Sequence, residues 1–505
     1  MSRQLLKDFE NYKNARREFV KTVAEEANRP ANVQTLIDLE VLSLLRPLLL
    51  DNVSSIQQTA ALAIGRLANG SEEVAIKVVD AGILPEIVAG LSSSDKYIQQ
   101  NSCFVIRTIA KHSEALAQKC VDAKALDPLV KCLSKFVVKV RESAAWAIGA
   151  IASHKPELAQ AVVDANAIQY LISAVQEPEL SLKRICVCAL GDIAKQNSDL
   201  AQCVIEARAI PTIAPLLKDS DAKLKQQVCT TLAHIAKHSI DSAELVVEAE
   251  IFPAAMHCLR DKDSGVRKAA SVLIREIVGH TQDLAQLVVR VDGAAALVNF
   301  LRPEQNNEPL HAVIAIGYIA SFSQALATEM IKADAPSAVL QVFNSTKNDN
   351  VKAMCAWTLG QLGRHSSDNA SKLASLNVLS LLLKAHNAKG ASEETKLKTK
   401  RALKMLIEHT NEIEALQPLI EEAPDKIKKY VLEQISKLLP KNPKMRRPFV
   451  TSGGFQAVQK INAEAGTKIR DYIDAINACY PEQAQRFYSP KYPEHLLQEI
   501  DNYEG

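Results

Sequence analysis

Residues 199–240 contain the unit that decides the fold, and they read DLAQCVIEARAIPTIAPLLKDSDAKLKQQVCTTLAHIAKHSI. A short amphipathic helix is predicted for DLAQCVIEA. A second is predicted for AIPTIAPLL, with Pro211 in its first turn, where the missing N–H costs nothing. The polar loop KDSD can cap the helix after it. This longer third helix is predicted for AKLKQQVCTTLAHIAKH, because its apolar residues recur near i, i+3, i+4 and i+7.

The end of this unit recurs along the chain with a fixed period. An apolar residue and a small one, followed two positions later by His, mark copies that end at His112, His154, His238 and His280. Degenerate copies end at Gly70, Gln196, Phe322, His365 and His409. Subtracting neighbouring numbers gives 42 from 70 to 322, then 43 and 44. This regularity predicts a continuous array of repeats.

Other positions keep the same period of 42 residues. An acidic residue recurs at one position before the position turns basic at Arg290 and Lys332. The acidic series is Asp38, Asp80, Asp122, Asp164, Glu206 and Glu248. Glycine recurs at Gly65, Gly149, Gly191 and Gly317. These positions indicate that each repeat places equivalent residues in equivalent environments.

Two short helices and one long helix in about 42 residues are the pattern of armadillo repeats. One unit buries too little apolar surface to offset the entropy of ordering it, so neighbouring units must stack. The expected fold class is all-α, a right-handed superhelical armadillo-repeat solenoid with a short non-repeat C-terminal extension. We expect an N-terminal capping helix over residues 1–28, repeats over 29–440 and the extension, as a cap or interaction tail, over 441–505.

The composition indicates a folded protein without strong global charge. The 505 residues are 47% hydrophobic and carry a net charge of +2, which gives no general attraction to nucleic acid or anionic lipid. No apolar run approaches the roughly 18 residues of a membrane span. The charged N-terminus lacks the apolar core of a signal peptide. We therefore expect a soluble intracellular protein that binds neither nucleic acid nor membrane.

The ten cysteines and the recurrent histidines are expected to be structural. The close pair Cys186-Val-Cys188 lacks the Cys-x2–4-Cys spacing of a zinc site, and free Cys behaves as a small buried hydrophobe. The histidines lie one repeat apart, whereas zinc needs its ligands within about 2.1 Å of one point. We interpret them as polar residues that interact with the dipole at the end of each third helix. No metal or cofactor is predicted.

No catalytic constellation is recognisable, and no enzymatic activity is expected. The chain lacks a phosphate-binding glycine loop, a G-x-S-x-G elbow and an H-E-x-x-H motif. Trp146 and Trp357 occupy matching repeat positions. Armadillo nuclear-import receptors place Asn four residues after such a Trp to clamp peptide backbones, but here those residues are Ala150 and Gln361. That ladder is missing, and we expect both tryptophans to lie in the core.

A local charge anomaly lies near the C-terminal end. Residues 396–447 hold 13 Lys and Arg against seven Asp and Glu, a net charge of +6, so the rest of the chain totals −4. Such a patch can meet an acidic partner surface, although solvated helix faces would also produce it. The candidate partner-binding residues are Lys396, Lys398, Lys400, Arg401, Lys404, Lys428, Lys429, Arg446 and Arg447.

The repeat period stops after about residue 440. A proline- and base-rich break, LPKNPKMRRP, precedes segments that are dense in Tyr and Pro. A Tyr/Pro segment after a solenoid indicates a cap or an interaction tail. The candidate tail contacts are Phe449, Tyr480, Phe487, Tyr488 and Tyr492.

The C-terminal tail relates this sequence to one particular family. The blocks RRPFVTSGGFQAVQKI (446–461) and INACYPEQAQRFYSPKYPEHLLQEIDNY (476–503) resemble the tail of the sperm-associated antigen six family. Members of that family are armadillo-repeat proteins of the central apparatus of motile cilia and flagella. The resemblance is expected to run along nearly the whole chain and includes IQQTAALAIGRLAN (56–69), VVEAEIFP (246–253) and LIREI (273–277).

The resemblance implies a structural scaffold of the axonemal central apparatus, a part of the cytoskeleton. Its implied partners are tubulin of a central-pair microtubule, other central-apparatus proteins and further copies of itself. Its implied role is central-pair integrity and ciliary or flagellar motility, and acidic tubulin is a plausible target for the basic residues. The alternative is a soluble armadillo adaptor that binds extended peptides in its groove, for transport or signalling. The missing Trp–Asn ladder argues against the import version.

Overall fold

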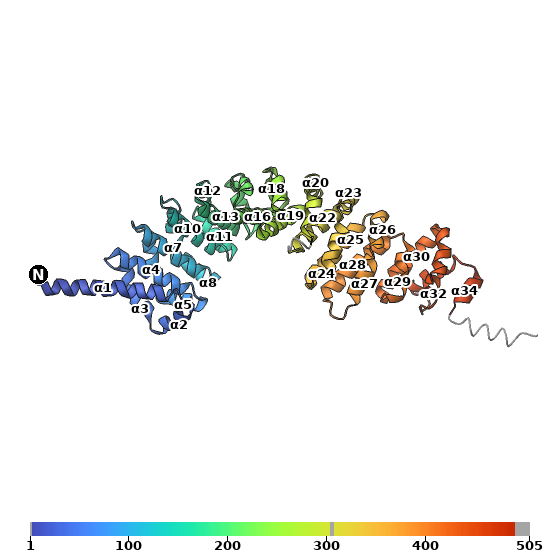
Figure 1. Cartoon of the computed structure of the whole chain (residues 1–505), viewed down its shortest axis with the longest axis horizontal. Coiled ribbons are helices and arrows are strands. Elements are labelled where there is room, and N and C mark those ends of the chain that lie inside the picture. Colours follow the sequence, from blue (N-terminus) through green and yellow to red (C-terminus); the bar gives the residue numbers. More distant parts are fainter. Residues whose placement is uncertain (1–2, 303–307, 490–505) are drawn as a thin grey trace, which may run out of the picture. The chain divides into compact units, whose positions relative to one another are not determined.

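The structure is a computed structural model that describes residues 3–302 and 308–489. These residues form helices and turns, and no strand occurs among them. The chain divides into two compact units, unit 1 (Met1–Leu273) and unit 2 (Ile274–Gly505). Figure 1 shows each unit as a succession of short and long helices.

Unit 1 begins with a single long helix and continues as three-helix repeats. Each repeat has two short helices and a third helix of 15 residues, as in α5, α6 and α7. The elements are α1 (Arg3–Glu26), α2 (Pro30–Asp38), α3 (Val41–Leu45), η1 (Pro47–Leu50), α4 (Ser54–Ala68), α5 (Glu72–Asp80), α6 (Leu84–Leu91), α7 (Lys96–Ala110), α8 (Glu114–Asp122), α9 (Leu126–Leu133), α10 (Val138–Ala152), α11 (Pro156–Asp164), α12 (Ala167–Val175), α13 (Leu180–Ala194), α14 (Ser198–Glu206), α15 (Ala209–Ile213), η2 (Ala214–Lys218), α16 (Ala222–Ala236), α17 (Ile240–Glu248) and α18 (Phe252–Cys258). Helix α19 (Ser264–Val278) begins in unit 1 and ends in unit 2.

Unit 2 continues the same order of helices and ends in shorter ones. Its elements are α20 (Gln282–Arg290), α21 (Gly293–Phe300), α22 (Leu310–Phe322), α23 (Gln324–Lys332), α24 (Ala335–Ser345), α25 (Asp349–Gly363), α26 (Ser367–Ser375), α27 (Val378–Asn387), α28 (Glu393–His409), α29 (Ile413–Glu422), α30 (Asp425–Lys441), η4 (Pro443–Met445), α31 (Arg446–Thr451), α32 (Gly454–Gln459), α33 (Lys468–Asn477) and α34 (Glu482–Tyr488). The all-α repeat architecture predicted from the sequence is confirmed.

The repeat at residues 199–240 folds almost as predicted. Its helices are α14, then α15 followed by η2, and α16. The second helix changes from α to 3₁₀ geometry where Pro215 lacks the N–H of an α-helical hydrogen bond. The predicted polar cap forms, because the Asp221 carboxylate accepts a hydrogen bond of 2.7 Å from the Leu224 N–H.

The third helices of successive repeats pack against one another and form the core. In unit 1, α4 packs on α1 and α7, and α10 packs on α7 and α13. In unit 2, α25 packs on α22 and α28, and α30 packs on α28 and α33. Their facing side chains, such as Ile64, Leu67, Ile106 and Ile109, are fully buried. Burial of these apolar faces therefore depends on the neighbouring repeat.

Four of the recurrent histidines join a repeat to the one before it. Each of these four rings lies just beyond the end of its own third helix, and its Nε2 bonds to a carbonyl at or near the end of the preceding third helix. Gln196 does the same with its side-chain amide. The bonds are His112–Ala68 (2.8 Å), His154–Ala110 (2.6 Å), Gln196–Ala152 (2.7 Å), His238–Ala194 (2.8 Å) and His365–Ser321 (3.0 Å). The predicted interaction with a helix end is therefore made with the helix of the preceding repeat, whose last carbonyls lack intrahelical partners. His409 differs, because it is the last residue of α28 and its Nδ1 bonds to the Met405 carbonyl of the same helix at 3.0 Å.

The cysteines are mainly core residues, as predicted. Seven of the ten are buried, and Cys188, Cys203 and Cys479 are half-buried. Burial raises the pKa of Cys120 and that of Cys355 to about 12. Residues 3–302 and 308–489 contain no group of three His, Cys, Asp or Glu placed to hold a metal ion.

One further property of the helices concerns their length and apolarity. No single helix in the described part of the chain is long and apolar enough to cross a membrane. Two bent pairs reach that length and composition only together, Pro156–Asp164 with Ala167–Val175 and Ser198–Glu206 with Ala209–Lys218.

Candidate partner-binding surfaces

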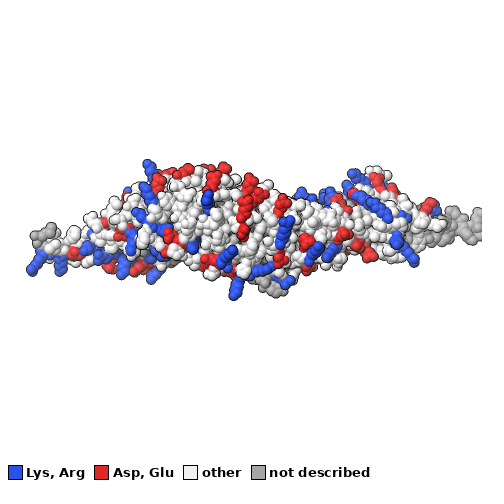
Figure 2. Space-filling view, turned by 90° about the horizontal axis from the view of Figure 1, so that it is seen from above, with Lys and Arg blue, Asp and Glu red and all other residues white. Residues whose placement is uncertain are grey.

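The predicted basic residues lie on α28, on α30 and at the start of the extension. Lys396, Lys400 and Lys404 follow one another at intervals of four residues, so they share one face of α28. The Lys404 ammonium lies 5.4 Å from the ring centroid of Tyr430 on α30, which brings the two helices into contact. Figure 2 shows Lys and Arg side chains gathered toward the right-hand end of the view, with Asp and Glu among them.

Most of these cations are available to a partner. Lys396 pairs with Glu393 at 2.9 Å and Lys404 with Glu408 at 3.7 Å, both within α28. Pairs of this exposed kind contribute about 0–1 kcal/mol, so an acidic partner can replace them. No ion pair to a described residue is made by Lys398, Arg401, Lys428, Lys429 or Arg447.

Arg446 differs from the other predicted cations because its guanidinium is used within the chain. Its Nε donates to the carbonyl of Leu439 at 3.0 Å and its Nη2 to that of Pro440 at 3.4 Å. These carbonyls end α30, where a cation is favoured by the helix dipole. Arg446 therefore closes the last long helix, whereas Arg447 beside it is exposed.

The extension folds back on the end of unit 2. Helix α32 packs on α29, and α33 packs on α30. Phe449 is 1% exposed. Tyr480 stacks on Phe455 with ring centroids 4.3 Å apart and donates a hydrogen bond of 3.1 Å to the Arg446 carbonyl. Burial raises the pKa of Tyr480 to about 12.

The predicted tail contacts therefore have different surroundings. Phe449 and Tyr480 pack within the chain, and Tyr488 meets Phe455 edge to face at 5.8 Å. Phe487 is 55% exposed and touches Tyr488 at 4.9 Å. Tyr492 lies outside the described residues. Phe487 is the described member of this set that a partner can reach most readily.

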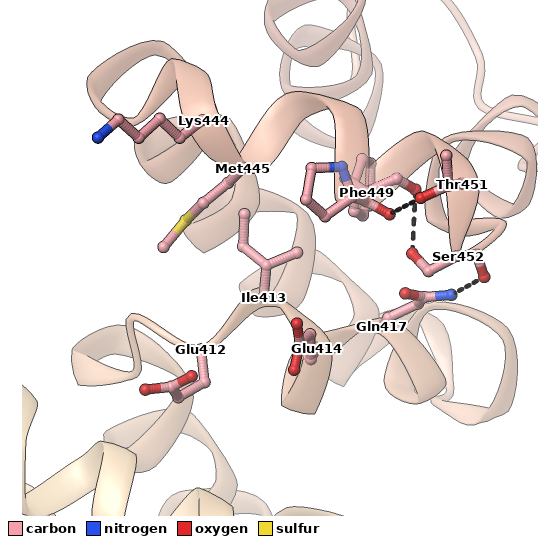
Figure 3. A pocket seen from close by; sticks show the side chains of 10 residues that line it. Glu412, Ile413, Glu414, Gln417, Lys444, Met445, Phe449, Thr451 and Ser452 are labelled. Atoms are coloured by element: carbon pink, nitrogen blue, oxygen red, sulfur yellow. Dashed lines mark hydrogen bonds between the residues drawn. The ribbon is translucent and has the colours of Figure 1, made fainter.

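A cavity of about 440 Å³ opens between the last repeat and the extension. Figure 3 shows Glu412, Glu414 and Gln417 on one side, facing Met445 and Phe449 on the other. The Gln417 amide donates to the Ser452 carbonyl, which ties α29 to the extension. The cavity is completed by Ile413, Lys444, Pro448, Thr451 and Ser452.

A smaller cavity of about 200 Å³ lies on the third helices of unit 1. Its walls come from α7, α10 and α13. Trp146 forms one wall and is 37% exposed, so the expectation that this tryptophan lies in the core is wrong. The Arg107 guanidinium lies over the Trp146 ring, 4.5 Å from its centroid.

The residue in the preceding repeat explains why Trp146 is exposed. Phe104 occupies the equivalent position of the repeat before, and its ring lies where a Cβ on Gly65 would be. One period after Gly65, at the position that faces Trp146, the sequence has Arg107. Because a long side chain fills the space that glycine leaves open, the indole stays at the surface. Glycines recur at this position in the sequence, so the departure at Arg107 was the signal that could have located the cavity.

These observations define the class of protein. Residues 197–237 match the family model of the Armadillo/beta-catenin-like repeat. An engineered protein of known crystal structure shares the fold, with a TM-score of 0.70 and 20% sequence identity over 87% of this chain and 98% of that one. The chain therefore has the fold of an all-α armadillo-repeat solenoid.

Within that class, the chain is similar to sperm-associated antigen 6. It is 47% identical to the Mus musculus protein and 46% identical to the Homo sapiens protein over 156 residues. The match covers 31% of this chain and 31% of each relative, so the chain spans about a third of the length of the curated relatives it matches. The predicted resemblance is confirmed, but over 156 residues and not along nearly the whole chain.

Proposed function

We propose that the chain is a structural scaffold of the axonemal central apparatus and contributes to central-pair integrity and to ciliary or flagellar motility. The observation that carries the proposal is the 47% identity with sperm-associated antigen 6. The stacked repeats add an extended set of surfaces on which proteins can assemble. A non-enzymatic role agrees with this architecture.

The proposed microtubule contact is the basic face of α28 with the adjoining start of α30. Tubulin presents an acidic surface, and the segment 396–447 carries a net charge of +6. Lys398 and Arg401 have no ion pair with a described residue, so an acidic partner need not displace one. Such a contact would be screened by salt, because exposed charges interact weakly beyond about 10 Å at 0.1 M ionic strength.

The proposal is tested by locating the tagged chain in cells with motile cilia after detergent extraction. A scaffold should remain along axonemes that contain a central pair and be absent from cilia that lack one. Complete release, or a signal in the nucleus or at cell junctions, would contradict the proposal and favour the soluble adaptor.

A charge-reversal variant tests the microtubule contact separately. Changing Lys396, Lys398, Lys400 and Arg401 to Glu should weaken axonemal retention, most of all at low salt, where the charges are least screened. The matched control reverses four exposed lysines on other repeats, Lys119, Lys124, Lys131 and Lys218. Unchanged retention of the first variant at both low and high salt would exclude this face as the contact.

A further inference from the structure

Two pairs of buried cysteines occupy equivalent places in unit 1. Cys103 on α7 is hydrogen-bonded to Cys132 on α9, and Cys229 on α16 is hydrogen-bonded to Cys258 on α18. Each pair joins the third helix of one repeat to the second helix of the next. Subtracting residue numbers gives 29 within both pairs and 126 between corresponding members, which is three times the period of 42. The array therefore brings two thiols together twice, in the same packing environment.

The hydrogen bonds of each pair continue to the main chain. The Cys132 thiol donates to the Leu91 carbonyl at 3.4 Å, and the Cys258 thiol donates to the Leu217 carbonyl at 3.8 Å. Each acceptor lies at or near the end of the second helix of the preceding repeat. These bonds hold the second-helix sulfur between a carbonyl and the thiol of its partner, which is the approach that formation of an S–S bond of about 2.05 Å requires.

The second-helix cysteine of each pair is the more readily ionised member. Hydrogen bonding from Cys103 lowers the pKa of Cys132 against the effect of burial, and the positive charge of Lys135 lowers it further. Hydrogen bonding from Cys229 likewise lowers the pKa of Cys258. Burial raises the pKa of Cys103. Because the thiolate is the nucleophile in thiol oxidation, the second-helix cysteine is the member that reacts first.

The second-helix cysteines lie where their helices end. Cys132 is the next-to-last residue of α9, and Cys258 is the last residue of α18. Both side chains are fully buried in the packed chain. The end of a short helix frays and opens at a lower free energy than the middle of a core helix. A small neutral oxidant can therefore reach these sulfurs without unfolding of the whole repeat.

We propose that Cys103 with Cys132, and Cys229 with Cys258, are two redox sites that each form a disulfide when the chain meets hydrogen peroxide. The thiolate of the second-helix cysteine attacks one peroxide oxygen and breaks the O–O bond, which gives a sulfenic acid and a hydroxide that takes up the thiol proton. The thiolate of the third-helix cysteine then attacks the sulfenic sulfur, so the S–S bond forms and a second water leaves. Each pair loses two electrons and two protons, and one peroxide becomes two waters.

A disulfide at either site cross-links neighbouring repeats. It closes a loop from the third helix of one repeat to the second helix of the next, which restricts the unfolded chain and stabilises the stacked repeats. Oxidation therefore makes unit 1 harder to unfold, and reduction reverses the effect. This inference goes beyond the scaffold role and does not depend on it, because the basic face of α28 takes no part in either pair.

The test is to treat the native full chain with hydrogen peroxide, block the remaining thiols with iodoacetamide and analyse the peptides by mass spectrometry without reduction. We expect four of the ten cysteines to escape blocking, in one peptide that links Cys103 to Cys132 and another that links Cys229 to Cys258. The oxidised chain should unfold at a higher urea concentration than the reduced chain. Dithiothreitol should remove both the links and the shift in the urea midpoint.

A pair of double variants shows whether the paired thiols are responsible. Changing Cys132 and Cys258 together to Ser should abolish both links and the shift in the urea midpoint. The matched control changes Cys120 and Cys186 to Ser, which are equally buried cysteines whose pKa burial raises to about 12. This control should form both links as the native chain does. Helical circular dichroism recorded before oxidation checks that both variants fold.

A third variant separates the two chemical steps. Changing Cys103 and Cys229 to Ala leaves the second-helix cysteines without a resolving thiol, so peroxide should leave a sulfenic acid on Cys132 and Cys258 that dimedone labels. Blocking of all ten cysteines in the peroxide-treated native chain would overturn the proposal, as would links among other cysteines in place of these two. Links that form only after the chain is unfolded in urea would also overturn it, because the packed repeats would then not be the source of the pairing.

Discussion

Trp146 in α10 and Trp357 in α25 occupy matching positions of two repeats, yet their surroundings differ. Trp146 is 37% exposed beneath the Arg107 guanidinium. Trp357 is half-buried, meets Tyr318 edge to face at 5.4 Å, and occupies the space that a Cβ on Gly317 would need. The repeat period places both rings on the third helices. The residue that the preceding repeat supplies decides whether the ring becomes part of the packing or part of a surface that can bind.

The largest loss of stability is expected from filling the space beside Trp357. Gly317→Ala should destabilise the chain by about 1–3 kcal/mol, because the new methyl group would overlap the indole and lie 2.7 Å from the Thr358 hydroxyl oxygen. The measurement is the midpoint of urea unfolding. Gly390→Ala is the matched control, since no atom lies within 4 Å of the added carbon, and it should leave the midpoint nearly unchanged.

A smaller loss of stability is expected from removing a hydrogen bond that both regions make between neighbouring repeats. His154→Ala and His365→Ala should each destabilise the chain by about 1 kcal/mol, because the carbonyls of Ala110 and Ser321 lose their partners. His154→Gln should be close to the native chain, since Gln196 makes the same bond in the next repeat. Thermal unfolding of the three variants checks this. A large loss in one region and none in the other would show that the repeats are not joined alike.

A smaller effect is expected from pH. Burial lowers the pKa of His234 in unit 1 and that of His386 in unit 2. The unfolded chain therefore takes up a proton first, so this stability is present above about pH 6.5 and is lost as the pH falls below it. His234→Gln and His386→Gln should each reduce the loss of stability between pH 7.5 and pH 5.5, as urea unfolding at the two pH values would show. An unchanged pH dependence in both variants would contradict the assignment.

Much of the fold could be predicted from the sequence, because each period of the sequence corresponds to one unit of two short helices and one long helix. His112, His154 and His238 mark the ends of third helices, and the predicted polar cap at Asp221 forms. The partner of each histidine could not be predicted, because its bond crosses to a neighbouring repeat. Register within a repeat follows from apolar spacing, whereas contacts between repeats need the packed structure.

The candidate sites could be predicted only in part. The basic face of α28 could be predicted, because the net charge of a segment is read from its sequence and does not depend on how the helices pack. That Arg446 closes α30 does not follow, since its use depends on where the chain turns after Leu439 and Pro440. The exposure of Trp146 depends on one residue, Arg107, which stands where Gly65, Gly149, Gly191 and Gly317 stand in other repeats. The burial of Tyr480 against Phe455 likewise depends on how the extension folds back.

The most direct test of this account is acrylamide quenching of the two tryptophans one at a time. Trp357→Phe leaves Trp146 as the reporter, and Trp146→Phe leaves Trp357, since the chain has two tryptophans. We predict stronger quenching and redder emission for Trp146 than for Trp357, and weaker quenching of Trp146 once Arg107→Gly is added. Equal quenching of the two tryptophans, or no change with Arg107→Gly, would contradict the claim that the preceding repeat decides whether this position is packed or free to bind.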